Sequence, residues 1–401
     1  MLSILMIHPN AHGLEFPFGE NPPYAAAILV EAQTGKVLFE YNSETVRSPA
    51  STQKLLLQLV VMDAITDGRA SLGDSIYTSS WASQIGGSQV YLKQGEIFQL
   101  EELLEAIAIA SANDACVAVA EHIGGTVAGF VNLMNNKSIA LRLRNTRCVN
   151  VHGLDDTPSS DSNTTTASDL ATIAREIVNY QKILDWSMIR YKPFRNEKFM
   201  LYTTNNLLGR FPDLDGLKTG YTQRAGFCLV ATAKRQNMRL ISVVMGARSE
   251  KTRDQASKEI LSWGFNHFSK MIIVKPNVNM GTVTLKWGVE PEVAAVTTDS
   301  IISVLNSEQI RNLRHIVELE QRDAPIAAKD TLGKLKVFSS NAIASMCLAD
   351  QFRLCFLIYC LIISGWSFKP PTTYSPRKYH SLFFSRLAVV FSCSPHWRTL
   401  L

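Results

Sequence analysis

The chain has 401 residues, of which 46% are hydrophobic and 19% charged, so it is globular in composition and long enough to bury a sizeable core. Its formal net charge of +5 is carried by residues 346–401, which leaves residues 1–345 neutral. The main body therefore lacks the basic surface that nucleic-acid binding requires, and we expect no nucleic-acid partner.

The cysteines give no sign of a disulfide framework or a zinc site. The main body contains Cys116, Cys148 and Cys228, which are scattered and form no C-x-x-C pair. We expect these three to be small buried hydrophobes, and we expect no metal and no cofactor. The other four lie near the C-terminus, at Cys347, Cys355, Cys360 and Cys393.

Residues 1–23 form a lead-in with two open interpretations. The apolar start Met1–Ile7 lacks the basic lead and the full hydrophobic run of a secretory signal. It is either the remnant of such a signal or a disordered start.

The first predicted element is a β-hairpin over residues 24–41, in which Thr34-Gly35 supplies the turn. The run 55–65 is apolar on every side, so it predicts a helix buried in the middle of a domain. Apolar residues with helical spacing predict three more helices, at 100–107, 114–123 and 168–180. The Ser/Thr/Asp-rich stretch Thr157–Thr166 is expected to be a surface loop.

The pattern changes to strands after Asp215. Three β-rich runs occur, at 216–221, 227–233 and 239–246, and a closing helix is expected at 254–268. Together with the opening hairpin and the helical middle, these elements predict an α/β (α+β) domain over residues 24–268. Its antiparallel sheet would combine strands from both ends of that range.

A second, smaller domain is expected over residues 271–345. Thr282–Trp287 alternates polar and apolar residues, and 330–337 reads as a turn entering a strand. This pattern predicts a small β-rich domain, followed by a tail at 346–401.

A serine and a lysine stand three positions apart where a loop enters the predicted buried helix, in Ser51-Thr52-Gln53-Lys54. Positions i and i+3 share a helix face, so the Lys54 amine can reach the Ser51 hydroxyl. A serine hydroxyl needs a base to take its proton, and a lysine serves at neutral pH only when its pKa is lowered. The pattern alone is weak, because Ser375-Pro376-Arg377-Lys378 also matches it.

The second motif, Ser111-Ala112-Asn113, lies at the junction of two predicted helices. Its hydroxyl could pass a proton to a departing amine, and its amide could hold a substrate backbone. Ser339-Ser340-Asn341 fits the same pattern. The alternative, polar residues that are simply hydrogen-bonded between helices, stays open.

The third motif, Lys218-Thr219-Gly220, occurs once, on a predicted strand. Lys218 offers a positive charge for a carboxylate, and Thr219 adds a hydroxyl donor. Gly220 has no side chain, so an extended substrate could lie against the strand edge. The alternative is an exposed strand lysine followed by turn residues.

The three motifs follow the order helix start, inter-helix loop and strand, which is the S-x-x-K, S-x-N, K-T-G set of penicillin-binding proteins and class A β-lactamases. Beyond the motifs, the chain resembles the low-molecular-mass D-alanyl-D-alanine carboxypeptidases, serine peptidases of the penicillin-binding group. The likeness covers about residues 24–268 and extends more loosely to about 340. Short runs carry it, among them Arg47–Ser51, Tyr91–Glu96, Val151–Asp155, Asp215–Gly220 and Val244–Arg248.

The resemblance implies a fold and an activity. The fold would be the transpeptidase domain of penicillin-binding proteins, with a helical subdomain and the small β-rich domain behind it. The protein would remove the terminal D-alanine from peptidoglycan pentapeptides through an acyl-enzyme on Ser51. β-Lactams would acylate the same serine as covalent inhibitors. The protein would be exported and act in the periplasm or on the extracytoplasmic face of the membrane.

The resemblance also assigns roles to residues. Ser51 would be the nucleophile, Lys54 the proton acceptor and Ser111 part of the proton relay. The backbone N–H groups of Ser51 and Tyr221 would form the oxyanion hole. The substrate-binding set would be Asn113, Lys218, Thr219, Gly220, Tyr221 and Arg248. For Arg248, the alternative of a plain surface arginine stays open.

Two rival functions remain to be weighed. A class A β-lactamase reads S-D-N at the second motif and needs a glutamate-activated water. Here Ala112 is the middle residue, and Cys148–Ser168 contains no glutamate, which favours the peptidase. A non-catalytic peptidoglycan-binding protein on the same fold would be expected to have lost Ser51 or Lys54, and both are present.

The chain departs from the family at a few positions. Gln53 stands where the family commonly has threonine, and Tyr221 stands where histidine is frequent. The tail is a larger departure, because the family usually ends in a short amphipathic helix on the membrane. The stretch Leu354–Phe368 carries no charge but is shorter than the roughly 20 residues of a spanning helix. An interfacial membrane anchor and an unpacked extension both stay open.

We predict that the tail carries any membrane affinity and none of the chemistry, because it holds the net positive charge and the longest uncharged apolar run. A chain ending at Ser345 should stay active and should no longer sediment with anionic vesicles. Equal sedimentation of the full and shortened chains would contradict the anchor.

Overall fold

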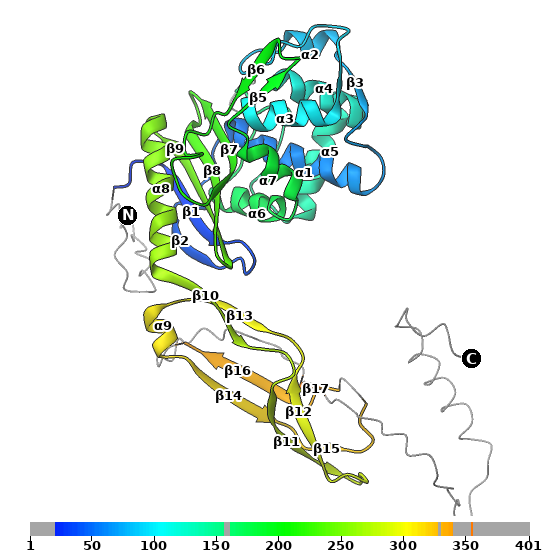
Figure 1. The fold of residues 1–401 in the computed structure, drawn as a ribbon, viewed down its shortest axis with the longest axis vertical. Coiled ribbons are helices and arrows are strands. Elements are labelled where there is room, and N and C mark those ends of the chain that lie inside the picture. Colours follow the sequence, from blue (N-terminus) through cyan, green and yellow to red (C-terminus); the bar gives the residue numbers. More distant parts are fainter. Residues whose placement is uncertain (1–20, 156–160, 328–329, 340–353, 356–401) are drawn as a thin grey trace, which may run out of the picture. The chain divides into compact units, whose positions relative to one another are not determined.

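The computed structural model describes residues 21–155, 161–327, 330–339 and 354–355. Its main sheet has five antiparallel strands in the order β2-β1-β9-β8-β7 (Figure 1). The strands are β1 (Ala26–Glu31), β2 (Val37–Tyr41), β7 (Leu214–Thr222), β8 (Gly226–Arg235) and β9 (Met238–Ala247). Because β1 pairs with β9, the sheet combines strands from both ends of the predicted domain, as expected from the sequence.

Helices cover both faces of this sheet (Figure 1). A 3₁₀ turn, η1 (Ala50–Gln53), leads into α1 (Lys54–Thr66). The remaining helices of this part are α2 (Ser80–Gln84), α3 (Leu100–Ala110), α4 (Asn113–Gly124), α5 (Val127–Ala140), α6 (Ala167–Ile177), α7 (Gln181–Met188) and α8 (Glu250–His267). The mixed α/β class predicted from the sequence is confirmed.

Alternation along the strands divides the interior into two apolar layers. Ile28 and Val30 of β1 belong to the core shared with α1 and α6, whereas Ala27 and Leu29 belong to the core shared with α8. Successive side chains of a strand point to opposite faces, so a strand covered on both faces must be apolar at nearly every position. This explains why β1 reads as a continuous apolar run and not as an alternating one.

The helix α1 lies inside the larger of the two cores. Its residues Leu55 to Leu57 and Leu59 are at most 1% exposed, and neighbouring helices pack around it. A helix enclosed on all sides needs no polar face, which is why its sequence shows no amphipathic stripe. The same enclosure buries Lys54, the first residue of the helix.

Two small two-stranded sheets extend the helical part, and the sequence did not predict either of them. One joins β3 (Ser75–Tyr77) to β4 (Ile97–Gln99), and the other joins β5 (Tyr191–Phe194) to β6 (Phe199–Tyr202). Their strands have three or four residues, too few for a clear alternation. The buried side chains Phe98 and Phe194 stack at 5.1 Å between ring centroids, which ties the two small sheets together.

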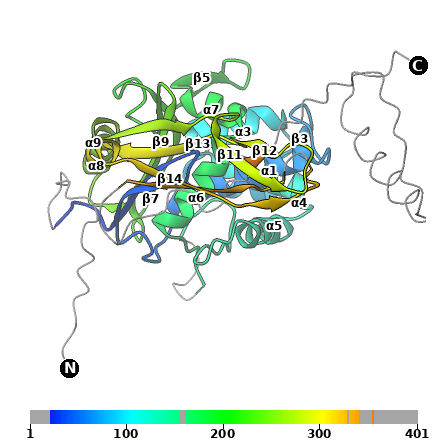
Figure 2. The ribbon, with the colours of Figure 1, turned by 90° about the horizontal axis from the view of Figure 1, so that it is seen from below.

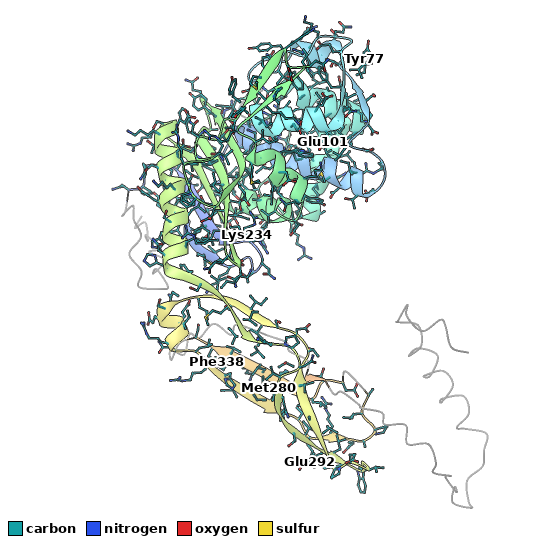
Figure 3. The ribbon with its side chains drawn as sticks, viewed as in Figure 1. Tyr77, Glu101, Lys234, Met280, Glu292 and Phe338 are labelled. Atoms are coloured by element: carbon teal, nitrogen blue, oxygen red, sulfur yellow. The ribbon has the colours of Figure 1, made fainter. Side chains whose placement is uncertain are left out.

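The β-rich region begins where α8 ends. Its elements are β10 (Phe268–Val274), β11 (Asn279–Lys286), β12 (Glu292–Thr297), β13 (Ile301–Asn306), α9 (Ser307–Arg311), β14 (Arg314–Leu319), β15 (Arg322–Asp323), β16 (Gly333–Phe338) and β17 (Leu354–Cys355). β11 pairs with β12 and β14 pairs with β16, and β14 also contacts β11 (Figure 2). Two small apolar clusters fill this region, and Met280 packs against both (Figure 3). The limits of a separate domain at 271–345 stay a prediction.

The expectation of a surface loop at Thr157–Thr166 is wrong for the part that the structure describes. Asn163 and Thr165 are 2% and 1% exposed, and Thr165 exchanges two backbone hydrogen bonds with Arg47. Polar residues can be buried when their hydrogen bonds are satisfied inside the protein, and composition alone does not reveal this. Residues 156–160 lie outside the described part.

The three main-body cysteines are free and buried, as predicted. Burial raises the pKa of the Cys116 and Cys148 thiols to about 12 and that of Cys228 to about 11. A thiol with so high a pKa stays protonated and unreactive at neutral pH. They therefore act as small packing residues.

The expectations for the two ends of the chain fall mostly outside the described residues. These are the lead-in at residues 1–20 and the tail from 346, of which only the short strand β17 is described. Within the described part, no single helix is both long and apolar enough to cross a membrane. The pair α4 and α5 meets the length and composition criteria only together and is bent by 84°.

Candidate active site

Ser51, the serine of the first motif, lies on η1, one 3₁₀ turn before α1 begins at Lys54. A 3₁₀ helix has three residues per turn, so residues i and i+3 stand directly above one another. The Lys54 Nζ accordingly lies 2.7 Å from the Ser51 Oγ. The contact expected from an α-helical spacing is present, although the backbone between the two residues is the tighter 3₁₀ form.

Lys54 is fully buried and has three polar partners in this part of the structure. Besides Ser51, its Nζ donates to Asn113 Oδ1 at 2.7 Å and to Ser111 Oγ at 3.2 Å. Burial lowers the pKa of Lys54 to about 8, and Cys116 and Asp114 oppose this shift. A neutral amine has two N–H donors and one lone pair, so it can donate to Asn113 and Ser111 while accepting from Ser51.

Ser111 and Asn113 stand at the junction of α3 and α4, as the sequence predicts. Ser111 caps α3 in the left-handed conformation, with φ 60°, and both residues are nearly inaccessible to solvent. Asn113 is held on two further sides: its Nδ2 donates to Gly86 O at 2.7 Å and its backbone N–H donates to Ser88 O at 2.8 Å. These bonds fix which side-chain atom of Asn113 faces Lys54.

The third motif lies on β7, the edge strand of the main sheet. Lys218 is 2% exposed, which contradicts the alternative of an exposed strand lysine. Burial lowers the pKa of Lys218 well below its ordinary value, and the charge of Lys54 adds to this effect. Thr219 Oγ1 lies 2.5 Å from Thr204 Oγ1 and is thereby held in one orientation.

Gly220 allows β7 to pass directly against the backbone of Ser51. A Cβ at this position would lie 2.9 Å from Ser51 N and 3.0 Å from Thr52 N, closer than real side chains approach. The glycine is therefore required by the close approach and not by its backbone conformation. It brings the K-T-G strand and the S-x-x-K turn into one site.

Tyr221 and Arg248 are more open than the other candidates. Tyr221 is 56% exposed, with its ring 4.3 Å from that of Phe227, and it borders a cleft of about 670 Å³. Arg248 is exposed just after β9, so its assignment to the site stays a prediction. The cleft is lined by Leu154, Asp155, Tyr221, Thr222, Gln223 and Arg224.

Gly153, which no motif singled out in the sequence, packs against the backbone just before Ser51. Its φ is +86°, and a Cβ there would lie 2.0 Å from Ala50 O. In the sequence, the run Val151–Asp155 stands out only through its resemblance to the family. A single glycine gives no sign of the residue against which it packs. Gly153 and Gly220 thus approach the Ala50–Ser51 backbone from two different segments.

Comparisons with known proteins identify the family of this chain. Residues 23–249 match the family described as D-alanyl-D-alanine carboxypeptidase. The chain is 36% identical to the D-alanyl-D-alanine carboxypeptidase DacF of Bacillus subtilis, over 77% of this chain and 80% of that protein. It is 31% identical to DacA of Escherichia coli K12, over 77% of each chain.

Solved structures are similar as well. Penicillin binding protein 5 from Haemophilus influenzae superimposes with a TM-score of 0.74 and 28% identity, over 86% of this chain and 99% of that chain. Penicillin-Binding Protein D2 from Listeria monocytogenes, in its ampicillin-bound form, gives a TM-score of 0.56 and 28% identity, over 61% and 98%. The resemblance inferred from the motifs is confirmed.

We predict that Gly153→Ala lowers the rate of acylation of Ser51 by at least about tenfold, because a methyl group would push Ala50 and the nucleophile out of place. The positive φ adds strain, so the variant should also be less stable. Acylation by a fluorescent penicillin and thermal unfolding would measure both effects.

The matched control is Gly73→Ala, because a Cβ at that position meets nothing within 4 Å. This variant should keep the parent rate. A Gly153→Ala protein that is acylated as fast as the parent would show that the packing against Ala50 does not govern the nucleophile.

Proposed function

This chain belongs to the D-alanyl-D-alanine carboxypeptidase family, and we propose that it removes the terminal D-alanine from peptidoglycan stem peptides. The observation that carries the proposal is the contact of the buried Lys54 amine with the Ser51 hydroxyl, at 2.7 Å. A base whose pKa lies near the working pH can both accept and return a proton. Such a site outside the cytoplasm would act on the bacterial cell wall, and β-lactams would acylate the same serine.

The first step is the formation of an ester on Ser51. The neutral Lys54 amine accepts the Ser51 proton as Oγ attacks the carbonyl carbon of the penultimate D-alanine. Ser111, 3.2 Å from the Lys54 Nζ, relays a proton to the nitrogen of the terminal D-alanine. The peptide C–N bond breaks, D-alanine leaves as a neutral amine, and Lys54 is again unprotonated.

The second step is hydrolysis of the ester. Lys54 takes a proton from a water molecule as the water oxygen attacks the ester carbonyl, and it returns that proton to the departing Ser51 Oγ. We assign the oxyanion hole to the backbone N–H groups of Ser51 and Tyr221. The close approach of Gly220 to Ser51 N supports this assignment, because Tyr221 is the next residue along β7.

The K-T-G strand would bind the free carboxylate of the substrate. Burial and the charge of Lys54 together lower the pKa of Lys218. A bound carboxylate supplies the missing negative charge and favours the protonated form of Lys218. Thr219, oriented by Thr204, would donate a hydrogen bond to the same carboxylate, and we keep Arg248 as a further candidate. Asn113 would hold the substrate backbone.

The test is mass spectrometry of the protein after benzylpenicillin, paired with a D-alanine release assay on a peptide ending in D-Ala-D-Ala. We expect a long-lived penicilloyl adduct on Ser51, D-alanine release from the peptide, and neither reaction in Ser51→Ala. Hydrolysis of the bulky adduct is slow because it excludes water, whereas the small acyl group left by the peptide admits it.

Three outcomes would contradict the proposal in different ways. Labelling of Ser51→Ala would move the nucleophile elsewhere. Catalytic consumption of penicillin, with an adduct that clears within seconds, would support the β-lactamase alternative. A folded parent protein that neither labels nor releases D-alanine would support the non-catalytic peptidoglycan-binding alternative.

The acylation rate should rise with pH through about 8. Only the unprotonated Lys54 can accept the Ser51 proton, and its pKa is lowered to about 8. Below this pH the amine is mostly protonated and the rate falls; above it the rate levels off. An acylation rate that stays constant from pH 6 to pH 9 would show that Lys54 does not control the step.

A further inference from the structure

Two segments outside the three motifs meet beside the SxN junction. One is the stretch 86–96, which runs from the Asn113 contacts to β4, and the other is the tight turn of the β5–β6 hairpin. The turn residues Arg195, Asn196 and Glu197 all have positive φ, between 51° and 65°. This turn places Arg195 against the stretch 86–96.

Arg195 makes a set of contacts that fixes its side chain. Its Nη2 donates to the Tyr91 carbonyl and to Glu96 Oε2, both at 2.9 Å. Its guanidinium carbon lies 5.7 Å from the ring centroids of both Phe98 and Phe194. A planar guanidinium can stack on aromatic rings while donating in its plane, which a lysine ammonium cannot do.

The same stretch holds the Asn113 amide. Gly86 O accepts from the Asn113 side chain, and Ser88 O accepts from its backbone N–H. From the other side, the Asp114 carboxylate accepts the backbone N–H groups of Val90 and Leu92 at 3.0 to 3.2 Å. Residues 86–92 are therefore bonded to α4 along their length.

Arg195 contacts this stretch between its last two hydrogen bonds with α4. Tyr91, whose carbonyl Arg195 holds, lies between Val90 and Leu92 and has a φ of 57°. A tyrosine in this left-handed conformation is strained and persists only when its surroundings hold it. Phe199 of the hairpin also contacts the Tyr91 ring, at 6.1 Å between centroids. The β5–β6 hairpin thus stabilises the conformation of Tyr91, which lies between the two backbone N–H groups that Asp114 accepts.

We propose that Arg195 is a positioning residue of the acylation reaction, which locks the stretch 86–92 and through it the Asn113 amide against Lys54. The inference rests on the proposed function, because it concerns the same nucleophile and base. Arg195 touches neither Ser51 nor Lys54 in this arrangement. Its effect runs through Tyr91, Gly86 and Asn113.

Loss of Arg195 should loosen the stretch 86–92 and allow water to approach Lys54. The titratable groups that shift the pKa of Lys54 in the described part are Asp114 and Cys116 on α4, and Lys218 on β7 feels the charge of Lys54. An Arg195 variant keeps all three residues, so we expect it to act mainly on the burial of Lys54. Better solvation favours the protonated amine, and the rise of the acylation rate should therefore move above pH 8.

The experiment compares Arg195→Gln, Arg195→Lys and a control, with acylation by a fluorescent penicillin measured across the pH range in which Lys54 titrates. The control is Arg235→Gln, because Arg235 also pairs with a carboxylate, Asp213 at 3.1 Å, and stacks on a ring, Phe265 at 4.5 Å. Both Arg195 variants should be acylated at least about tenfold more slowly, with the pH limb displaced upward. The control should match the parent.

The lysine variant separates positioning from charge. A lysine keeps the positive charge but loses the planar fork and the guanidinium contacts with Phe98 and Phe194. If Arg195→Lys restores the parent rate and pH limb, charge alone accounts for the effect and the proposal is overturned. An Arg195→Gln protein with the parent rate and pH limb would overturn it as well.

A milder variant guards against simple unfolding. Glu96→Gln weakens one of the two polar contacts of Arg195 and leaves the one to the Tyr91 carbonyl. Glu96→Gln should shift the pH dependence of the acylation rate in the same direction by a smaller amount. If Arg195→Gln does not fold and Glu96→Gln has the pH dependence of the parent, the result would count against the proposal. Penicillin labelling of the parent at Ser51 is measured first. If the parent is not labelled, the proposed function and the positioning role are both rejected. If the parent is labelled normally, the variants test the role of Arg195 alone.

Discussion

The buried amine of Lys54 is the constraint on which the site depends. An ammonium group in an apolar interior costs several kcal/mol unless polar groups surround it. The shift of the Lys54 pKa from 10.5 to about 8 corresponds to roughly 3 kcal/mol of preference for the neutral form. The apolar helix α1 produces this shift, because it carries its first residue into the core. Ser111 and Asn113, at the junction of α3 and α4, then supply hydrogen-bond partners for the amine in place of water.

The nucleophile is held mainly by backbone packing. Gly153 and Gly220 approach Ala50 and Ser51 more closely than any side chain would allow. Protein interiors transmit small displacements because they are close-packed, so these two contacts fix the position of Ser51 relative to Lys54. The position of the Lys54 amine is thus fixed by polar contacts, and the position of Ser51 by steric contacts. Separate segments of the chain provide them, which explains why the site requires the complete fold.

The sequence predicted the parts of this arrangement that follow local rules. The β-rich, largely apolar runs of β1, β7, β8 and β9 predicted the strands of the sheet, and the apolar run of α1 predicted its central helix. The motif spacing pointed to Ser51, Lys54 and Lys218. What it did not predict depends on contacts between distant segments. Asn163 and Thr165 are polar yet buried, because their partners lie elsewhere in the chain. The roles of Gly153 and Arg195 depend on Ala50 and Tyr91, about 100 residues away in each case.

The two buried lysines also explain why the proposed substrate must end in a free carboxylate. Burial lowers the pKa of both lysines, and the charge of Lys54 lowers the pKa of Lys218 further, so the two amines are not charged together without a cost in free energy. Asp114 is the buried acid beside Lys54, and its carboxylate is already bonded to the N–H groups of Val90 and Leu92. A carboxylate arriving against Lys218 would draw the positive charge onto that residue and leave Lys54 neutral. Substrate binding would then favour the neutral base that the reaction needs, and a peptide without a free C-terminus would lack this effect on Lys54.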